Sequence, residues 1–214
     1  MLKGSVVVAR ESEVMPTDAR SLAWRVWGLD WWELLPQGFD DITVEVGVFA
    51  KAEPFVKEHY PRIFGDSQGR FLAQPATLAK DRFTQEMDTL LIRERDKLIG
   101  ICLGHPTDWS TYYVRTLAIL PEYREQKVAQ RFERILCGGL ASANVERVEA
   151  ECSVANAAMI RLFTTAGWMP AGTIASERWG MTVRFTRILD PRAGEVFRRQ
   201  YVNISAFGRD PKPA

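Results

Sequence analysis

A short polar turn between two apolar segments is the first place in this sequence where residue types and spacing could do chemistry. The segment 111–120 is aromatic and aliphatic with almost no formal charge, which predicts a strand covered on both faces. Pro121 ends that strand, and the polar residues 122–129 follow. Apolar residues then recur on one face of a helix, at Val128, Phe132, Ile135, Leu136 and Leu140. The turn therefore joins the end of a strand to the start of a helix.

This junction is suited to binding phosphate. The backbone N–H groups of about residues 125–129 would have no partners within the helix and would lie at the positive end of its dipole. Arg124 and Lys127 add positive charge beside them. The alternative is an ordinary strand–helix junction whose N–H groups face water, and the junction alone does not decide between the two.

The chain continues to alternate strands and helices after this point. In 145–154, Val148, Ala150, Cys152 and Val154 fall on one side and Glu149, Glu151 and Ser153 on the other, which predicts a second strand. A crossover through a helix makes this strand parallel to the first. Asn156 then opens a short helix over 157–165, and Ala166-Gly167-Trp168 leads into a third strand.

With these residues in place, the chain resembles the GNAT superfamily of acyl-CoA N-acyltransferases. The family's strand ends in a Leu-x-Val-x-Pro-like run followed by Glu-Tyr-Arg, which here are Leu117-Ala118-Ile119-Leu120-Pro121 and Glu122-Tyr123-Arg124. The family then has Asn-x-x-Ala-x-x-Leu-Tyr and a Gly-aromatic pair, which here are Asn156-Ala157-Ala158-Met159-Ile160-Arg161-Leu162-Phe163 and Gly167-Trp168. The resemblance covers roughly residues 88–189, and two motifs at the right separation are more specific than either alone.

The resemblance implies an α/β fold of the GNAT type. The central sheet would be mixed, with about six to seven strands, splayed at the cofactor strand and flanked by helices. We expect a GNAT domain over 1–190 and a C-terminal extension over 191–214. Within the domain, 36–87 would be an enlarged acceptor-side segment before the central hairpin. Because family members set acceptor specificity on this side, the enlargement argues against transferring a substrate from any relative.

The resemblance also implies where acetyl-CoA or another acyl-CoA would bind as co-substrate. The backbone N–H groups of Leu117 and Ile119 would hold the pantetheine arm and polarise the thioester carbonyl. Asn156 would contact the same arm. The pyrophosphate would contact residues of the turn, namely Arg124, Gln126, Lys127, Val128 and Ala129.

Three departures from the family pattern bear on function. The two glycines of the phosphate turn are replaced by Glu125 and Lys127, and only the small residue Ala129 remains. Glycine serves there because the pyrophosphate approaches the backbone closely, so Lys127 either pairs with a phosphate or blocks the approach. The sequence therefore predicts weakened, altered or absent CoA binding. Phe163 stands where many members have the tyrosine that protonates the departing thiolate, and phenylalanine has no proton to give.

The third departure concerns the catalytic base. Many members have a glutamate on the strand before the turn, where this chain has Arg115-Thr116. The ribosomal-protein N-terminal acetyltransferases of the family instead have a glutamate five residues before the motif asparagine, and Glu151 occupies that position. A carboxylate there could take a proton from an ammonium acceptor through water. The alternative is a solvated or salt-bridged strand residue, since Glu149 faces the same way.

Two hypotheses of different classes follow. The first is an N-acyltransferase that transfers an acyl group, acetyl being the simplest, from acyl-CoA to a primary amine of a small molecule or protein by direct attack. The second is a catalytically degenerate GNAT-fold binding or assembly module with weak or no CoA binding. The second hypothesis is favoured by Lys127, Glu125 and Phe163. We favour the first, because losing the general acid lowers the rate by only about 10²–10⁴-fold and an enzyme can remain active without it.

Size and charge limit the other classes. The chain has 214 residues, 46% of them hydrophobic, which suits one domain with a full core. Its net charge is +1 with both signs interspersed, so we expect no nucleic-acid partner and no membrane partner, and a homodimer is left open. Three cysteines in apolar runs suit reduced thiols in a cytoplasmic protein. His59 and His105 lack metal-ligand partners at suitable spacing, so no metal site is expected.

The remaining elements must position this site. We expect an edge strand at 5–9 and a helix from an N-cap at Thr17 through Leu29. Trp24, Trp27 and Trp31 would share one face of this helix, packed on the sheet in preference to lining a substrate pocket. Further expectations are a strand at 41–49, helices at 55–64 and 75–87, hairpins at 90–104 and 171–188, a helix at 193–202 and a frayed tail at 207–214.

Overall fold

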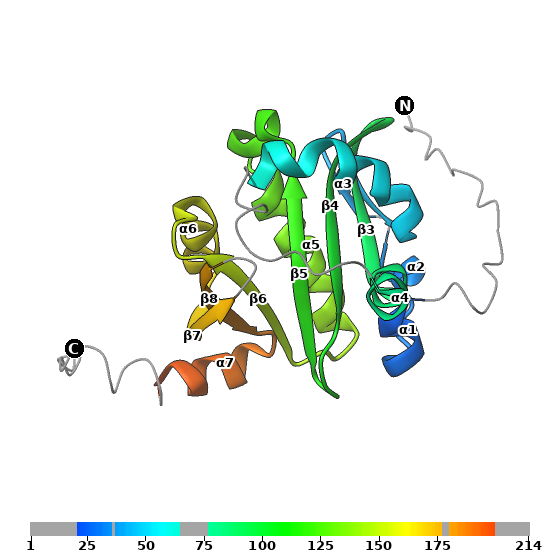
Figure 1. Ribbon diagram of the computed structural model, residues 1–214. Coiled ribbons are helices and arrows are strands. Elements are labelled where there is room, and N and C mark those ends of the chain that lie inside the picture. Colours follow the sequence, from blue (N-terminus) through cyan, green and yellow to red (C-terminus); the bar gives the residue numbers. More distant parts are fainter. Residues whose placement is uncertain (1–20, 36, 65–76, 177–179, 200–214) are drawn as a thin grey trace, which may run out of the picture.

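The strands that the structure describes form one mixed sheet of eight, in the order β1-β2-β3-β4-β5-β6-β8-β7 (Figure 1). The computed structural model describes residues 21–35, 37–64, 77–176 and 180–199. The strands are β1 (Gln37–Phe39), β2 (Ile42–Gly47), β3 (Asp88–Glu94), β4 (Lys97–Pro106), β5 (Thr111–Ile119), β6 (Arg147–Ser153), β7 (Met169–Ser176) and β8 (Gly180–Ile188). The predicted mixed α/β sheet is confirmed, with one strand more than the upper end of the prediction.

Helices cover both faces of this sheet. They are α1 (Leu22–Trp27), α2 (Trp31–Leu34), α3 (Phe49–Phe64), α4 (Leu78–Glu86), α5 (Val128–Ser142), α6 (Ala157–Thr165) and α7 (Pro191–Phe197), with a 3₁₀ helix η3 (Pro121–Gln126) before α5. In Figure 1, α3 and α4 lie in front of the sheet and α5 runs behind it. The apolar stripe of α5, including Val128, Phe132, Leu136 and Leu140, is buried in the core. None of the described helices is long and apolar enough to cross a membrane.

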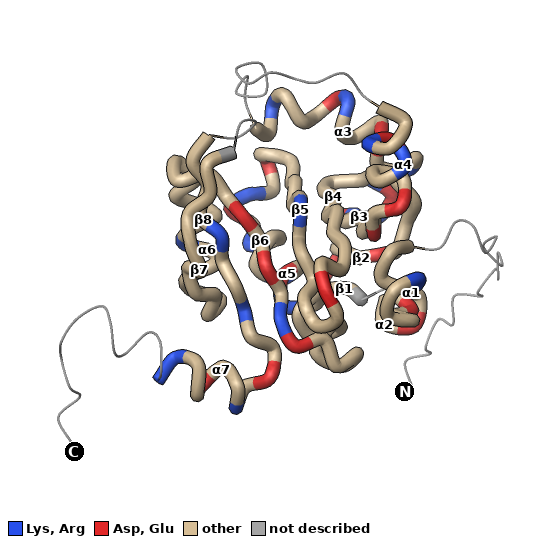
Figure 2. The backbone as a smooth tube through the Cα atoms, turned by 60° about the horizontal axis from the view of Figure 1, so that its bottom comes forward, with Lys and Arg blue, Asp and Glu red and all other residues tan. Residues whose placement is uncertain are grey.

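The elements predicted around the polar turn form where they were expected. The strand at 111–120 is β5, the strand at 145–154 is β6, and the helix opened by Asn156 is α6. The burial of β6 alternates as its sequence does, with the apolar residues inside and the glutamates half-buried. Basic and acidic positions are interspersed along the described elements (Figure 2).

The N-terminal helix differs from the prediction. In place of one helix reaching Leu29, α1 ends at Trp27 because Gly28 adopts the left-handed conformation with φ 68° and caps it. Asp30 then caps α2, which carries Trp31 into the core against the ring of Tyr112 at 5.6 Å. The break moves the tryptophans off a single helical face. The expected strand at 5–9 and the cap at Thr17 lie outside the described residues.

Asp88 is a buried carboxylate that ties α1 to the sheet. It begins β3, is 1% exposed, and accepts a hydrogen bond from the backbone N–H of Ala23 at 3.2 Å. Burial raises the pKa of Asp88 to about 6, although hydrogen bonds from Ser21 and Ala23 act in the other direction. The first turn of α1 is therefore held on the sheet by a group whose charge depends on pH.

Candidate active site

The candidate site is the gap that opens between β5 and β6. These two strands form a parallel pair over only four positions, from Thr111↔Arg147 to Val114↔Ala150. Each strand then continues beyond the pairing, β5 to Ile119 and β6 to Ser153. Figure 1 shows the two strands diverging toward the end where η3 and α6 lie. The predicted splaying of the sheet at this strand is thus observed.

A β-bulge in β5 lies at the point where the pairing stops. On β4, Gly104 pairs with Val114 and Leu103 pairs with Thr116, so Arg115 is the extra residue. A bulge bends its strand and increases the local twist. The bend directs the second half of β5 away from β6 and so contributes to opening the gap.

The unpaired half of β5 directs backbone groups into this gap. The N–H of Leu120 donates to the carbonyl of Ile99 on β4 at 2.9 Å. Successive residues of a strand direct their N–H groups to opposite sides, so Leu117 and Ile119 face away from β4. Beyond Val114, none of the described strands pairs with that side of β5. The two N–H groups expected to hold a cofactor arm therefore lie along the open side of β5.

The turn after β5 is tighter than the sequence indicated. The 3₁₀ helix η3 begins at Pro121 and buries the ring of Tyr123, whose hydroxyl donates to Glu94 at 2.7 Å. Lys127 follows in the left-handed conformation with φ 60°. Because η3 includes the residues up to Gln126, the backbone N–H groups without helical partners are those of the first turn of α5, Val128 to Gln130. The sequence alone predicts them at about residues 125–129.

The start of α5 has no side chain to cap it. Lys127 is its N-cap and makes no side-chain capping bond, whereas Ser21, Thr77, Asn156 and Asp190 each cap their own helices. The N–H groups of the first turn therefore receive no side-chain cap and lie at the positive end of a helix of 15 residues, with Val128 buried and Ala129 and Gln130 half-buried. A cavity of about 290 Å³ adjoins this turn on the side of β1 and β2, and the acidic residues Asp40, Asp41 and Glu94 line it together with Gln126, Val128 and Arg131.

The charged side chains of the turn do not fill it. Lys127 and Glu125 are exposed. Arg124 extends to α3, where its guanidinium donates to the carbonyl of Ile63 at 3.0 Å. Gln126 donates to the carbonyl of Glu122 at 3.3 Å, and Ala129 is half-buried against the core. The two bulky replacements, Glu125 and Lys127, thus extend into solvent, whereas Val128 in the first turn of α5 is buried.

Glu151 lies on β6 one position beyond the last strand pair, at the start of the gap. Arg184 of β8 donates to Oε1 of Glu151 through two nitrogens, at 3.0 and 2.6 Å, and the hydroxyl of Thr182 donates to Oε2 at 3.2 Å. Glu149 faces the same way and forms longer ion pairs with Arg147 at 3.6 Å and Arg184 at 3.8 Å. The side chains of Glu151 and Glu149 are equally shielded, at 18% and 17% exposure.

Tyr113 belongs to this cluster, and the sequence reasoning missed it. The residue lies opposite Glu149 in the β5–β6 pairing, and the guanidinium of Arg184 lies over its ring at 5.9 Å from the centroid. Burial and the negative charge of Glu151 raise the pKa of Tyr113 to about 12. The ring also contacts His105 at 5.6 Å, whose pKa is lowered by burial. The alternation of side chains along a strand could have indicated Tyr113, because residues two positions apart, such as Tyr113 and Arg115, are expected on the same face.

The helix motif after β6 has a structural role in this fold. The side chain of Asn156 caps α6 by accepting the N–H of Met159 at 3.1 Å, and its NH₂ group has no hydrogen-bond partner among the described residues. Phe163 is 5% exposed and packs between Trp168 at 4.7 Å and Phe185 at 5.0 Å. Among the described residues, no three histidines, cysteines, aspartates or glutamates lie together as metal ligands would.

A mixed sheet that opens at its parallel pair, with a helix start beside the opening that no side chain caps, defines the class of this α/β protein. The chain belongs to the acetyltransferase (GNAT) family, because the model of that family matches residues 54–168. No curated protein matches the sequence.

Solved structures of this family share the fold. The ribosomal-protein-S5-alanine acetyltransferase from Vibrio fischeri is 13% identical with a TM-score of 0.56, over 73% of this chain and 98% of that one. A mutant spermidine N-acetyltransferase from Vibrio cholerae is 12% identical with a TM-score of 0.54, over 72% and 98%. A GNAT family acetyltransferase from Elizabethkingia anophelis, with acetyl-CoA bound, is 12% identical with a TM-score of 0.51, over 70% and 99%.

Proposed function

We propose that this protein is an N-acyltransferase that transfers an acyl group, acetyl in the simplest case, from acyl-CoA to a primary amine of a small molecule or protein in the cytoplasm. The observation that carries the proposal is the open side of β5 beside the uncapped first turn of α5. Unpaired N–H groups in both places suit a ligand with amide groups at one end and phosphates at the other. A structural neighbour has acetyl-CoA bound.

In this proposal the cofactor lies in the gap. The N–H groups of Leu117 and Ile119 would bind the pantetheine arm and polarise the thioester carbonyl, and the NH₂ group of Asn156 would contact the arm. The pyrophosphate would lie against the turn, in contact with Arg124, Gln126, Lys127, Val128 and Ala129. Arg124 would have to exchange its bond to the carbonyl of Ile63 for a phosphate oxygen.

The reaction would be a direct transfer. The amine nitrogen attacks the thioester carbon, the C–N bond forms, and the C–S bond breaks to release the CoA thiolate. Holding both reactants in this geometry would supply most of the rate. Glu151 would take the proton of the ammonium acceptor through water, with Arg184 and Thr182 fixing its carboxylate. After attack the nitrogen would release its second proton to water. Because Phe163 has no hydroxyl and is packed in the core, water would deliver a proton to the departing thiolate.

Titration of the protein with acetyl-CoA by calorimetry tests the proposal. We expect saturable binding and, in the presence of a panel of primary amines, release of CoA thiol. Desulfo-CoA, which lacks the thiol but keeps the pyrophosphate, should compete. No heat and no thermal shift at millimolar acetyl-CoA would overturn the proposal.

The second candidate is a catalytically degenerate binding module, and a specific observation favours it. Both oxygens of Glu151 are already engaged by Arg184 and Thr182, so a water molecule must compete for them. Acetyl-CoA that binds but is not consumed with any amine would support this candidate over the enzyme.

A further inference from the structure

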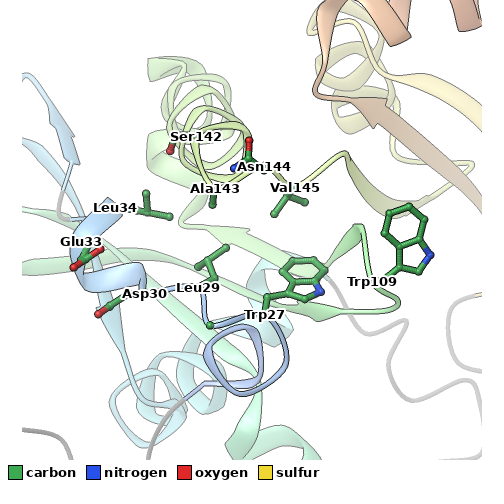
Figure 3. Close-up of a pocket in the computed structure, with 11 residues that line it drawn as sticks. Trp27, Leu29, Asp30, Glu33, Leu34, Trp109, Ser142, Ala143, Asn144 and Val145 are labelled. Atoms are coloured by element: carbon green, nitrogen blue, oxygen red, sulfur yellow. The ribbon is translucent and has the colours of Figure 1, made fainter.

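A separate cavity of about 480 Å³ lies at the other end of α5 (Figure 3). The helices α1 and α2 bound it on one side, and residues 142–145 at the end of α5 bound it on the other. Trp109, in the loop before β5, completes its edge. Because α5 has 15 residues at 1.5 Å each, the cavity is about 22 Å from the turn where that helix begins. It shares no residue with the candidate active site.

Two indoles line this cavity from neighbouring segments. Trp109 is 79% exposed, and Trp27 is half-buried and donates its indole N–H to the carbonyl of Asp108 at 3.1 Å. The carboxylate of Asp108 in turn accepts the N–H groups of Ser110 at 2.7 Å and Thr111 at 2.8 Å. The loop that carries Trp109 is thus held in place, and the walls exist without a ligand.

The charge around the cavity is negative. Figure 3 shows Asp30 and Glu33 at the end away from the two indoles. Neither carboxylate forms an ion pair with any residue that the structure describes, and the lining contains no lysine, arginine or histidine. The C-terminal end of α5, whose last turn has no basic residue, adds the negative end of its dipole. Arg147, the basic residue next to this region, instead donates to the hydroxyl of Thr111 at 2.9 Å.

We propose that this cavity binds an organic cation on an aliphatic stem, an alkylammonium or guanidinium group. Asp30 and Glu33, neither of which forms an ion pair among the described residues, would attract the cationic group at one end of the cavity. The indoles of Trp27 and Trp109 would pack against its aliphatic stem at the other end. Leu29, Leu34 and Val145 provide an apolar floor for the stem. An anion would meet like charge, and a neutral apolar ligand would gain nothing from the two carboxylates. The same chemistry occurs in free amines and in lysine or arginine side chains.

Titration with n-butylammonium chloride, followed through the indole N–H signals in NMR spectra, tests this proposal. We expect saturable shifts of the Trp27 and Trp109 signals. Sodium chloride at equal ionic strength and 1-butanol at equal concentration should not reproduce them, because the first lacks the stem and the second lacks the charge. An absence of saturable shifts, or an equal response to 1-butanol, would overturn the proposal.

Substitutions of the lining residues test which side chains form the walls of the cavity. Trp109→Ala and Glu33→Gln should each weaken n-butylammonium binding by about 3- to 10-fold. Both side chains are exposed, so the fold should be kept. The matched controls are Trp32→Ala, which removes a 53% exposed indole of α2 outside the lining, and Glu58→Gln on α3, with a side chain 74% exposed. Unchanged affinity in both test variants, or an equal loss in the controls, would contradict the assignment.

A capped tripeptide with a central lysine distinguishes the two sources of the cation. Binding at least about 10-fold tighter than that of n-butylammonium, a gain of about 1.4 kcal/mol, assigns the site to a side chain of a polypeptide, and equal affinity assigns it to a free amine. If the same peptide with norleucine binds as well as the lysine peptide, the proposal fails. Acetyl-CoA affinity should be unchanged in Trp109→Ala, so this test and that of the acyltransferase proposal fail independently.

Discussion

Lys127 shows how a single residue can be identified from sequence while its consequence requires the structure. The sequence has lysine at this position, where the family pattern has glycine. The structure gives it φ 60°, a conformation that glycine adopts freely and that costs other residues roughly 1–2 kcal/mol. The backbone strain therefore remains, and the exposed side chain can either pair with a phosphate or obstruct its approach. No pattern in the sequence reports the direction of one side chain in a turn.

Replacing Lys127 with glycine separates charge from backbone conformation. If Lys127 binds phosphate as proposed, Lys127→Gly should lower acetyl-CoA affinity by about 3- to 30-fold, the range expected for one charge-assisted contact. The free energy of unfolding should stay the same or rise by less than about 1 kcal/mol, since relief of strain is offset by chain entropy. Arg95→Gly is the matched control, because it removes a positive charge at φ 51° in the β3–β4 turn. Tighter binding in Lys127→Gly would instead identify an obstruction.

Glu151 and Glu149 provide a matched pair for testing the base. Glu151→Gln should reduce turnover of acyl-CoA with an amine at least about 100-fold, with acetyl-CoA affinity in calorimetry unchanged. Glu149→Gln makes the same change two residues earlier on the same face at equal exposure, and should have little effect. Equal losses in the two variants would assign both residues to an ion-pair network that supports β8.

Asp88 predicts a pH dependence of stability. The pKa of Asp88 is raised to about 6 in the folded protein from 3.8, so the folded state holds a proton that the unfolded chain releases between these values. The stabilisation from this proton is complete below about pH 4 and is lost as the pH rises through about 6, a change on the order of 1–3 kcal/mol. Urea unfolding of Asp88→Asn at pH 4 and pH 7 should show a smaller loss than the parent protein over the same interval. An equal loss in both proteins would assign the pH dependence to other groups.

At the scale of elements, regular segments could be predicted and irregular ones could not. The strands and helices from β5 to α6 follow hydrophobic periods that tertiary contacts only reinforce. The break at Gly28 and the bulge at Arg115 depend on packing between segments distant in sequence. The 3₁₀ helix before α5 is stabilised by the bond from Tyr123 to Glu94, 29 residues away, which no local pattern contains.

The attachment of α5 to β8 depends on one buried carboxylate. Glu133, 4% exposed, accepts hydrogen bonds from the indole of Trp168 at 2.8 Å and from the guanidinium of Arg187. Glu133→Ala should lower the free energy of unfolding in urea by about 3–5 kcal/mol, because it leaves a partly buried charge without its partner. Glu195→Ala, which breaks an exposed ion pair with Arg199, should cost less than about 1 kcal/mol. A small effect in Glu133→Ala would mean that water replaces the carboxylate.

At the scale of the molecule, a family resemblance predicted the sheet, whereas the cavity beside α1 and α2 was not foreseen. The tryptophans of this region were expected to pack in the core, and Trp31 does so. Trp27 packs against the core and also lines the cavity, together with Trp109. The two tryptophans line the same cavity because the loop before β5 lies beside α1. Contacts between segments so far apart in sequence cannot be predicted from residue spacing.

Cofactor binding should be visible in global stability. At free acetyl-CoA 100 times its Kd, the folded state gains about 2.7 kcal/mol. For a chain of this size each kcal/mol raises Tm by roughly 2–4 °C, so a shift of about 5–10 °C is expected in a thermal melt. Dephospho-CoA is the control: it lacks the 3′-phosphate but keeps the pyrophosphate, so it should still raise Tm if the turn binds the pyrophosphate. A Tm independent of acetyl-CoA concentration would count against binding.

The four-position pairing of β5 with β6 divides the sheet into two parts, β1–β5 and β6–β8, joined by very few main-chain hydrogen bonds. Such parts can open separately. A molecule lying along the open side of β5 would add contacts to both parts and make them unfold together. Amide hydrogen exchange should then slow in β6 and β8 as well as in β5. Ligand binding in the gap would thus be detectable in strands that lie outside the cofactor turn.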